Sequence, residues 1–133
     1  MKAEQIQIRS HQREELIDIT GLAEDYLGRS GVVDGFLVLF VPHTTAAVTI
    51  NENADPAVTR DIVYKLHKEL PPTDDYLHSE GNSDAHIKSS LVGPSLQMII
   101  SGGKLILGRW QAIYFCEFDG PRIRNLLMKA IAD

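Results

Sequence analysis

The strongest constraint on the fold is a pair of glycines, Gly102 and Gly103, between two segments with strand-like composition. Residues 95–101 read SLQMIIS and residues 104–111 read KLILGRWQ. Two glycines accept the positive φ angles of a two-residue β-hairpin turn, which joins antiparallel strands. A third apolar segment, AIYFCEF at residues 112–118, follows directly. The sequence therefore predicts antiparallel β-structure in this part of the chain.

Further strands are predicted on both sides of this region. Residues 5–10 (QIQIRS) and 15–20 (ELIDIT) alternate between polar and apolar positions with the period of two that is typical of a strand. Residues 35–43 (GFLVLFVPH) are apolar on both faces and predict a central strand buried on both sides. Residues 46–53 (AAVTINEN) predict another strand. The segment 122–133 (RIRNLLMKAIAD) is compatible with a strand or a helix, and we favour a strand.

Three helices are predicted between the strands. The first covers residues 21–31 and ends at a glycine. The second begins at Asp55, which can cap it, with Pro56 in its first turn. The third runs from about Ser83 to about Leu91 and stops before a Gly-Pro pair. We therefore expect an α+β fold with antiparallel β-sheets and two to three helices.

The size and charge of the chain narrow its class and its partners. We expect one domain spanning residues 1–133, and a chain of this size buries about two thirds of the surface that it exposes when unfolded. The formal net charge is -5, and no basic stripe of the kind that binds nucleic acid is present. No segment has the ~20 apolar residues of a membrane span, and the start of the chain does not resemble a signal peptide. A cytoplasmic protein that binds neither nucleic acid nor membranes is expected.

A histidine, two threonines and a glutamate lie close together in residues 43–52. His43 ends the predicted buried strand, and Glu52 lies on the same face of the next strand as Val48 and Ile50. A carboxylate that continues an apolar face is costly to bury unless it is paired, protonated or bound to a metal. Glu52 could therefore serve as a general acid or base, or it could return the strand end to solvent. The polar residues of this region that could contact a substrate are Thr44, Thr45, Asn51 and Asn53.

Two further histidines flank the start of the third predicted helix. His86 lies in the first turns of that helix, and His78 lies in the preceding loop, which can fold back toward it. Together with His43 they form a set of three imidazoles, each next to a loop. Three histidines with an open position are the usual arrangement of a catalytic zinc site. Three nitrogen ligands suit zinc better than magnesium, which prefers oxygen.

Groups that could hold a phosphate occur in two places. The free N–H groups at the start of the third helix attract anions, and Lys88, Ser89 and Ser90 could add donors there. Arg122 and Arg124 lie two residues apart and face the same side if their segment is a strand. They could share one phosphate or could pair with nearby carboxylates.

Glu117 repeats the pattern of Glu52, because it continues the face of Ile113 and Phe115. It is the second candidate for a general acid or base. Cys116 is the single cysteine of the chain, which excludes an internal disulfide. Its aromatic neighbours predict burial, which argues against a thiolate nucleophile.

Three segments together resemble the YjbQ-like family, which is also described as the secondary thiamine-phosphate synthase enzymes. They read HTTAAVTINENADP, EGNSDAHIKSSLVGPS and LGRWQAIYFCEFDGPR, occur in the family's order and cover most of residues 34–124. Arg109 stands where the family has a threonine, and the segment after Arg124 is more compatible with a helix than the family's valine-rich strand. Neither difference involves a histidine.

The resemblance implies a compact α+β fold with antiparallel sheets and a homotrimeric assembly. It implies that His43, His78 and His86 are the family's histidines and form a metal site near a subunit boundary. The implied activity is weak thiamine-phosphate synthesis, in which a pyrimidine diphosphate joins a thiazole phosphate and pyrophosphate is released. The residues that would hold phosphate oxygens are Lys88, Arg122 and Arg124.

Three interpretations of the function follow. The first is a metal-dependent enzyme, a synthase or a hydrolase, that acts on a small phosphorylated substrate with Glu52 or Glu117 as acid or base. The second is a non-catalytic trimer that binds a metal or an anionic metabolite. The third is a structural or interaction module, whose histidines would be dispersed without a shared cavity.

Overall fold

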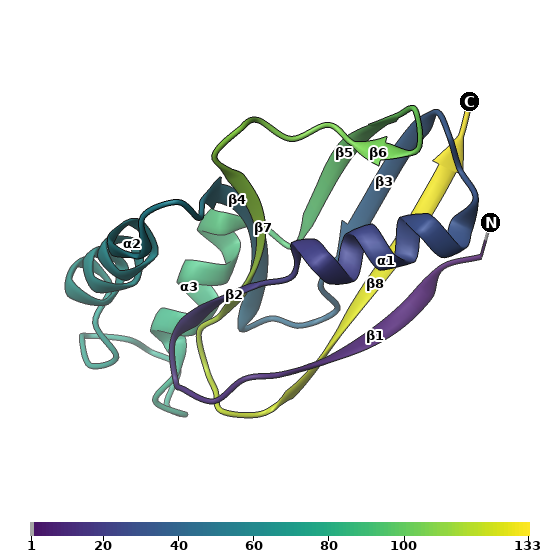
Figure 1. Ribbon diagram of the computed structural model, residues 1–133. Helices are drawn as coiled ribbons and strands as arrows, with labels where there is room; N and C mark the ends of the chain where they lie inside the picture. The colour runs from purple at the N-terminus through teal and green to yellow at the C-terminus, as the bar shows by residue number, and fades with distance from the viewer. Residues whose placement is uncertain (1) are drawn as a thin grey trace.

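A computed structural model describes residues 2–133, and Figure 1 shows the order of its elements. The strands are β1 (Glu4–Arg9), β2 (Glu15–Asp18), β3 (Gly35–Phe40), β4 (Ala46–Glu52), β5 (Ser95–Ser101), β6 (Lys104–Leu105), β7 (Gln111–Glu117) and β8 (Ile123–Ala132). The helices are α1 (Thr20–Ser30), α2 (Pro56–Glu69) and α3 (Ser83–Val92).

The strands form two antiparallel sheets, so the predicted α+β fold is confirmed. The larger sheet has the order β1-β8-β3-β5-β6, and the smaller one has the order β2-β7-β4. β8 pairs with β1 on one side and with β3 on the other. The strand that we favoured for residues 122–133 is therefore a central strand of the larger sheet.

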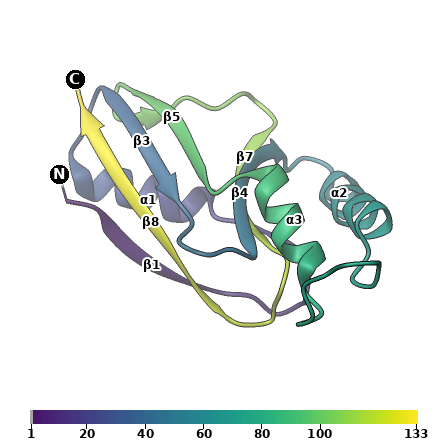
Figure 2. The same ribbon diagram turned by 180° about the vertical axis from the view of Figure 1, so that it is seen from behind.

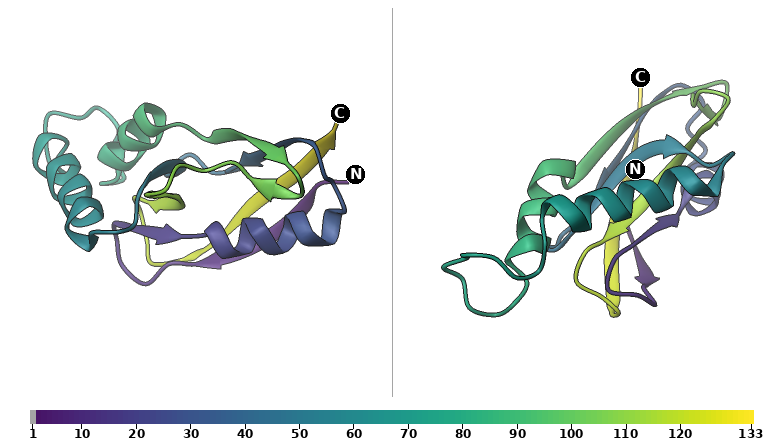
Figure 3. Two further views of the ribbon diagram at one scale, coloured as in Figure 1. Left: turned by 45° about the horizontal axis from the view of Figure 1, so that its top comes forward. Right: turned by 90° about the vertical axis from the view of Figure 1, so that its left-hand side faces the viewer.

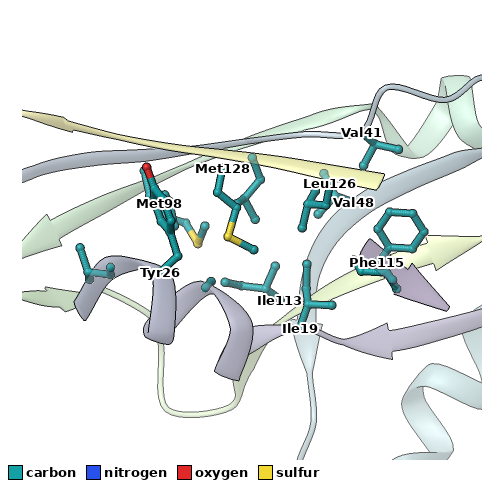
Figure 4. Close-up of a cluster of buried hydrophobic side chains, with 14 of the residues drawn as sticks. Ile19, Tyr26, Val41, Val48, Met98, Ile113, Phe115, Leu126 and Met128 are labelled. Carbon is teal, nitrogen blue, oxygen red and sulfur yellow. The ribbon is translucent and has the colours of Figure 1, made fainter. Parts of the chain in front are cut away.

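The main core lies between the two sheets and α1, as the close-up in Figure 4 shows. α1 contributes Tyr26, whose hydroxyl accepts a hydrogen bond from the N–H of Ala130 in β8 (2.9 Å). Leu126 and Met128 of β8 and Phe115 of β7 are fully buried against it. α2 and α3 lie together at the opposite end of the molecule from the chain termini (Figure 3).

Local sequence signals set most of the helix and turn boundaries as predicted. The carboxylate of Asp55 accepts a hydrogen bond from the N–H of Ala57 (2.9 Å), and Pro56 is the first residue of α2. Gly102 and Gly103 have φ angles of 60° and 74° and connect β5 to β6. Both glycines adopt the left-handed conformation that the hairpin turn requires.

Two predicted strands are shorter than expected. The predicted strand 104–111 is regular only over Lys104–Leu105, because the chain then crosses to the smaller sheet. The carbonyl of Gly108 accepts a hydrogen bond from the N–H of Gln111 (3.0 Å), which forms a turn in place of a ladder. The strand predicted at residues 15–20 ends at Asp18, whose carboxylate accepts from the N–H and the hydroxyl of Thr20 and so starts α1.

The prediction that residues 35–43 are buried on both faces was wrong. Leu37 and Leu39 are fully buried, whereas Phe36 and Phe40 are 37% and 43% exposed. β3 is central in its sheet, but no helix of the described chain covers the outer face of that sheet (Figure 2). No helix within residues 2–133 has both the length and the apolar character needed to cross a membrane.

Candidate functional site

His43 and His86 line one cavity of about 250 Å³ between the turn after β3 and helix α3. Two backbone hydrogen bonds hold these segments together. The N–H of Val41 donates to the carbonyl of Pro94 (2.7 Å), and the N–H of Val48 donates to the carbonyl of Gly93 (3.1 Å). The remaining residues that line the cavity are Thr44, Ala46, Ser89, Ser90 and Pro94.

The ring of His43 is held by the backbone of β8. Its Nε2 accepts a hydrogen bond from the N–H of Asn125 (2.9 Å), so in the neutral ring the proton resides on Nδ1. Burial and the nearby charge of Arg124 lower the pKa of His43 below its ordinary value. His43 is therefore neutral at pH 7 and offers an N–H donor.

His78 and His86 lie side by side. Their ring centroids are 5.3 Å apart, with the ring planes at 80°. Nδ1 of His78 lies 3.0 Å from the hydroxyl oxygen of Ser83, which fixes the ring to the start of α3. Both histidines line a second hollow of about 290 Å³ with Ser83 and Ile87, so His86 borders both spaces.

The predicted three-histidine zinc site does not fit one chain. Among residues 2–133 no group of three or more His, Cys, Asp or Glu side chains is arranged to hold a metal ion. His43 is also unsuited to bind a metal, because one ring nitrogen accepts a backbone hydrogen bond and the other carries the proton. His78 and His86 remain as a pair, and zinc binding stays a prediction that requires a ligand from outside the chain.

Glu117 and Arg124 form a buried ion pair away from the solvent. Glu117 is fully buried and Arg124 is 2% exposed. Nε of Arg124 donates to Oε1 of Glu117 (2.9 Å), and its Nη2 donates to the hydroxyl oxygen of Thr45 (2.8 Å). Burial raises the pKa of Glu117, but hydrogen bonds from Arg124 and Ser10 outweigh burial, so the pKa lies below its ordinary value. Thr45, Glu117 and Arg124, all predicted as site residues, are thus joined to one another and stabilise the turn that carries His43.

Lys88 faces a second buried cluster of charges. Its Nζ donates to Oδ2 of Asp84 (2.7 Å) and also contacts the carboxylate of Glu14. Arg13 donates to the other oxygen of Asp84 (3.0 Å). Burial raises the pKa of Asp84, but its bonds to Arg13 and Lys88 lower it further than burial raises it. Arg122, in contrast, is half-exposed and pairs with Asp119 (3.2 Å).

The predicted residues at the end of β4 lie far from His43 within one chain. Ala46, which lines the cavity, is paired with Glu117, and Glu52 at the other end of β4 is paired with Gln111. Six residue steps along a strand span about 20 Å. Asn51 and Asn53 flank Glu52 and are exposed.

Burial of Cys116 agrees with the sequence analysis. The thiol is 1% exposed, and burial raises its pKa to about 12. A thiol with so high a pKa carries almost no thiolate at pH 7.

The cavity also contains a hydroxyl that the sequence marks only weakly. Ser89 is 6% exposed, and its Oγ has no hydrogen-bond partner within residues 2–133. A buried hydroxyl without a partner costs about 1–3 kcal/mol. The signal for it is the spacing of His86, Ser89 and Ser90, which places all three on one side of a helix.

Nearly the whole described chain matches a known family. Residues 4–133 match the family model described as UPF0047 protein YjbQ-like. The chain is 54% identical over 127 residues to UPF0047 protein MJ1081 of Methanocaldococcus jannaschii, covering 96% of this chain and 92% of that protein. It is 49% identical over 126 residues to UPF0047 protein YugU of Bacillus subtilis, covering 93% of this chain and 95% of that protein.

Solved structures share the fold. A crystal structure of a YjbQ/UPF0047-family protein from Clostridium acetobutylicum superimposes with a TM-score of 0.95 at 55% identity, covering 96% of this chain and 99% of that one. The protein APE1520 from Aeropyrum pernix K1 gives a TM-score of 0.95 at 36% identity and covers both chains fully (100%).

Proposed function

The chain belongs to the YjbQ-like UPF0047 family, and from this premise we propose that it is an enzyme that binds a small phosphorylated molecule between His43 and His86. The observation that carries the proposal is the shared cavity. It combines the N–H donor of a neutral His43 with the hydroxyl groups of Thr44 and Ser89, whereas the hydroxyl of Ser90 donates within its own helix. Phosphate oxygens accept hydrogen bonds from such groups.

The chemistry that suits this cavity is acid–base assistance to the departure of a phosphate or pyrophosphate. His43 is neutral at pH 7 because its pKa is lowered by burial and by Arg124, and a second imidazole, His86, lies across the cavity. Imidazole is the side chain most often used for proton transfer near neutral pH. His86 takes this role in the proposal in place of Glu52 and Glu117. His43 contributes a fixed N–H hydrogen-bond donor, because its other ring nitrogen already accepts from the N–H of Asn125.

We propose weak thiamine-phosphate synthesis as the specific reaction. The bond between the pyrimidine methylene carbon and its diphosphate breaks, the thiazole nitrogen forms a bond to that carbon, and pyrophosphate leaves with the electron pair. The cavity donors would stabilise the charge on the departing oxygens.

The test is turnover by single variants. Wild-type protein is incubated with the pyrimidine diphosphate and the thiazole phosphate, and both pyrophosphate and thiamine phosphate are measured. We expect His43→Ala and His86→Ala each to lower the rate about 100-fold or more. His11→Ala is the matched control, because His11 is exposed and does not line the cavity. Equal rates in all variants would contradict the proposal.

One observation favours a non-catalytic binding protein as the second candidate. Neither Glu52 nor Glu117 lines the cavity, and the described residues that line it include no carboxylate. Calorimetry with pyrophosphate separates the two candidates. Binding without turnover of the substrate pair would favour the binder.

We further propose a homotrimer in the cytoplasm. The outer face of the larger sheet supports self-association, since it is uncovered (Figure 2) and carries paired apolar side chains. Phe36 lies opposite Ile99 and Ile131, and Phe40 lies opposite Leu127. Ile99 is 65% exposed in the single chain. A contiguous exposed apolar surface is typical of a protein–protein interface.

A further inference from the structure

Helix α3 divides its polar side chains between two environments. Asp84 and Lys88, one turn apart, point into the buried charge cluster with Arg13 and Glu14. His86, Ser89 and Ser90 line the cavity that also contains His43. The same helix therefore supplies ion pairs on one side and neutral donors on the other.

Ser89 and Ser90, the two serines of this helix that line the cavity, differ in their hydrogen bonds. The hydroxyl of Ser90 donates to the carbonyl of His86 (2.9 Å), so its proton is already used within the helix. The hydroxyl of Ser89 has no partner within residues 2–133, although the side chain is more than nine-tenths buried at the cavity wall. A buried hydroxyl in a folded protein normally has a hydrogen-bond partner.

The chemistry of the cavity wall indicates what that partner is. The wall consists of two histidines, three hydroxyl-bearing residues, an alanine and a proline, without an acidic side chain. A carboxylate on the wall would repel an anion, whereas hydroxyl and N–H donors attract its oxygens. A ligand rich in acceptor oxygens and poor in donors fits this wall.

We propose that the Ser89 hydroxyl donates a hydrogen bond directly to a phosphate oxygen of the bound molecule, and that Lys88 does not touch it. The inference rests on the proposed phosphate-binding function and adds the residue that selects for the oxyanion. Lys88, which precedes Ser89 in the sequence, forms ion pairs with Asp84 and Glu14 on the other side of α3.

The experiment compares two neighbouring serines. Inorganic phosphate and methyl phosphate are titrated into wild-type protein, Ser89→Ala and Ser90→Ala, and the dissociation constants are obtained from NMR amide shifts. We expect Ser89→Ala to weaken binding about 10- to 100-fold, which corresponds to the loss of one hydrogen bond to a charged group. Ser90→Ala, the matched control, should stay within about threefold of wild type because its hydroxyl bonds within the helix.

Thermal unfolding of the same variants separates a binding role from a structural one. Ser89→Ala removes a hydroxyl that lacks a partner, so its midpoint Tm should be equal to or above that of wild type. A lower Tm with unchanged phosphate affinity would show that Ser89 serves the fold and would overturn the inference.

The failure of this inference is distinguishable from failure of the proposed function. If wild-type protein binds phosphate and Ser89→Ala binds it equally well, only the role of Ser89 is overturned. If wild-type protein binds neither probe up to about 50 mM, well above the millimolar range of weak ligands, both proposals are overturned.

Discussion

At the scale of single residues, the partners of a charged side chain decide whether it is free for catalysis. Glu117 continues an apolar face as expected, but its carboxylate accepts hydrogen bonds from Arg124 and Ser10. Arg124 comes seven positions later, whereas Ser10 is separated from Glu117 by 107 positions. A pattern in one strand can therefore predict that a carboxylate is buried, but not which distant residue pairs with it.

The buried pair leads to a stability prediction. Arg124→Met should lower the free energy of unfolding by about 3–5 kcal/mol, because it leaves the carboxylate of Glu117 buried and unpaired. Urea unfolding at pH 7 measures the loss. Arg122→Met is the control, since the exposed pair of Arg122 with Asp119 contributes about 1 kcal/mol or less. Similar losses in both variants would contradict the burial argument.

Acid should weaken the fold through the same carboxylates. The pKa values of Glu117 and Asp84 lie below their ordinary values because hydrogen bonds from cationic partners outweigh burial. The unfolded chain therefore takes up protons first as the pH falls, so this stabilisation is complete above about pH 5 and is lost progressively below it.

Unfolding measured at a series of pH values tests whether stability falls with falling pH as predicted. The free energy of unfolding, measured in urea from pH 7 to pH 3, should fall steadily below pH 5 in wild-type protein. The double variant Glu117→Gln/Arg124→Met should show a flatter profile. Glu24→Gln, at an exposed position, should keep the wild-type slope, and a wild-type slope in the double variant would speak against the assignment.

At the scale of elements, the sequence correctly predicted those boundaries that depend on neighbouring residues. Asp55 and Pro56 start α2, and the pair of glycines after β5 turns the chain, because each signal acts within a few residues. The end of β6 was missed, since it depends on where the chain leaves one sheet for another. His43, His86 and Thr44 were predicted as site residues and do share a cavity, whereas the distance of Glu52 follows from the pairing of β4 with β7.

The capping residue of α2 gives a prediction at this scale. Asp55→Ala should lower the free energy of unfolding by about 1 kcal/mol, because the N–H of Ala57 loses its acceptor. Urea unfolding measures the change, and Asp55→Asn, which keeps an acceptor oxygen, should restore most of it. An equal loss in both variants would indicate that the carboxylate charge, not the cap, stabilises the helix.

At the scale of the whole molecule, the uncovered face of the larger sheet is the clearest difference from expectation. The apolar pattern on both faces of β3 predicted two covering layers, and the described chain supplies only the inner one. Within residues 2–133 the inner layer is α1 and the smaller sheet, and the outer face has no covering element (Figure 2).

Self-association through this face is directly measurable. Light scattering should give three times the mass of one chain for wild-type protein and a lower mass for Phe40→Lys, since a charge would replace an apolar side chain that pairs with Leu127. Leu77→Lys is the control, because Leu77 is fully exposed on a loop (104%) and distant from the sheet in sequence. A trimeric Phe40→Lys variant would place the interface elsewhere.

The position of β8 between β1 and β3 has a consequence for protein synthesis. Among the described elements, β1 is translated first and β8 last, yet β1 pairs only with β8. Until β8 has been synthesised, β1 has no neighbouring strand, and β3 lacks its hydrogen-bonded neighbour on one side. The larger sheet therefore stays incomplete until β8 has been synthesised, and its apolar strands are open to aggregation during that time.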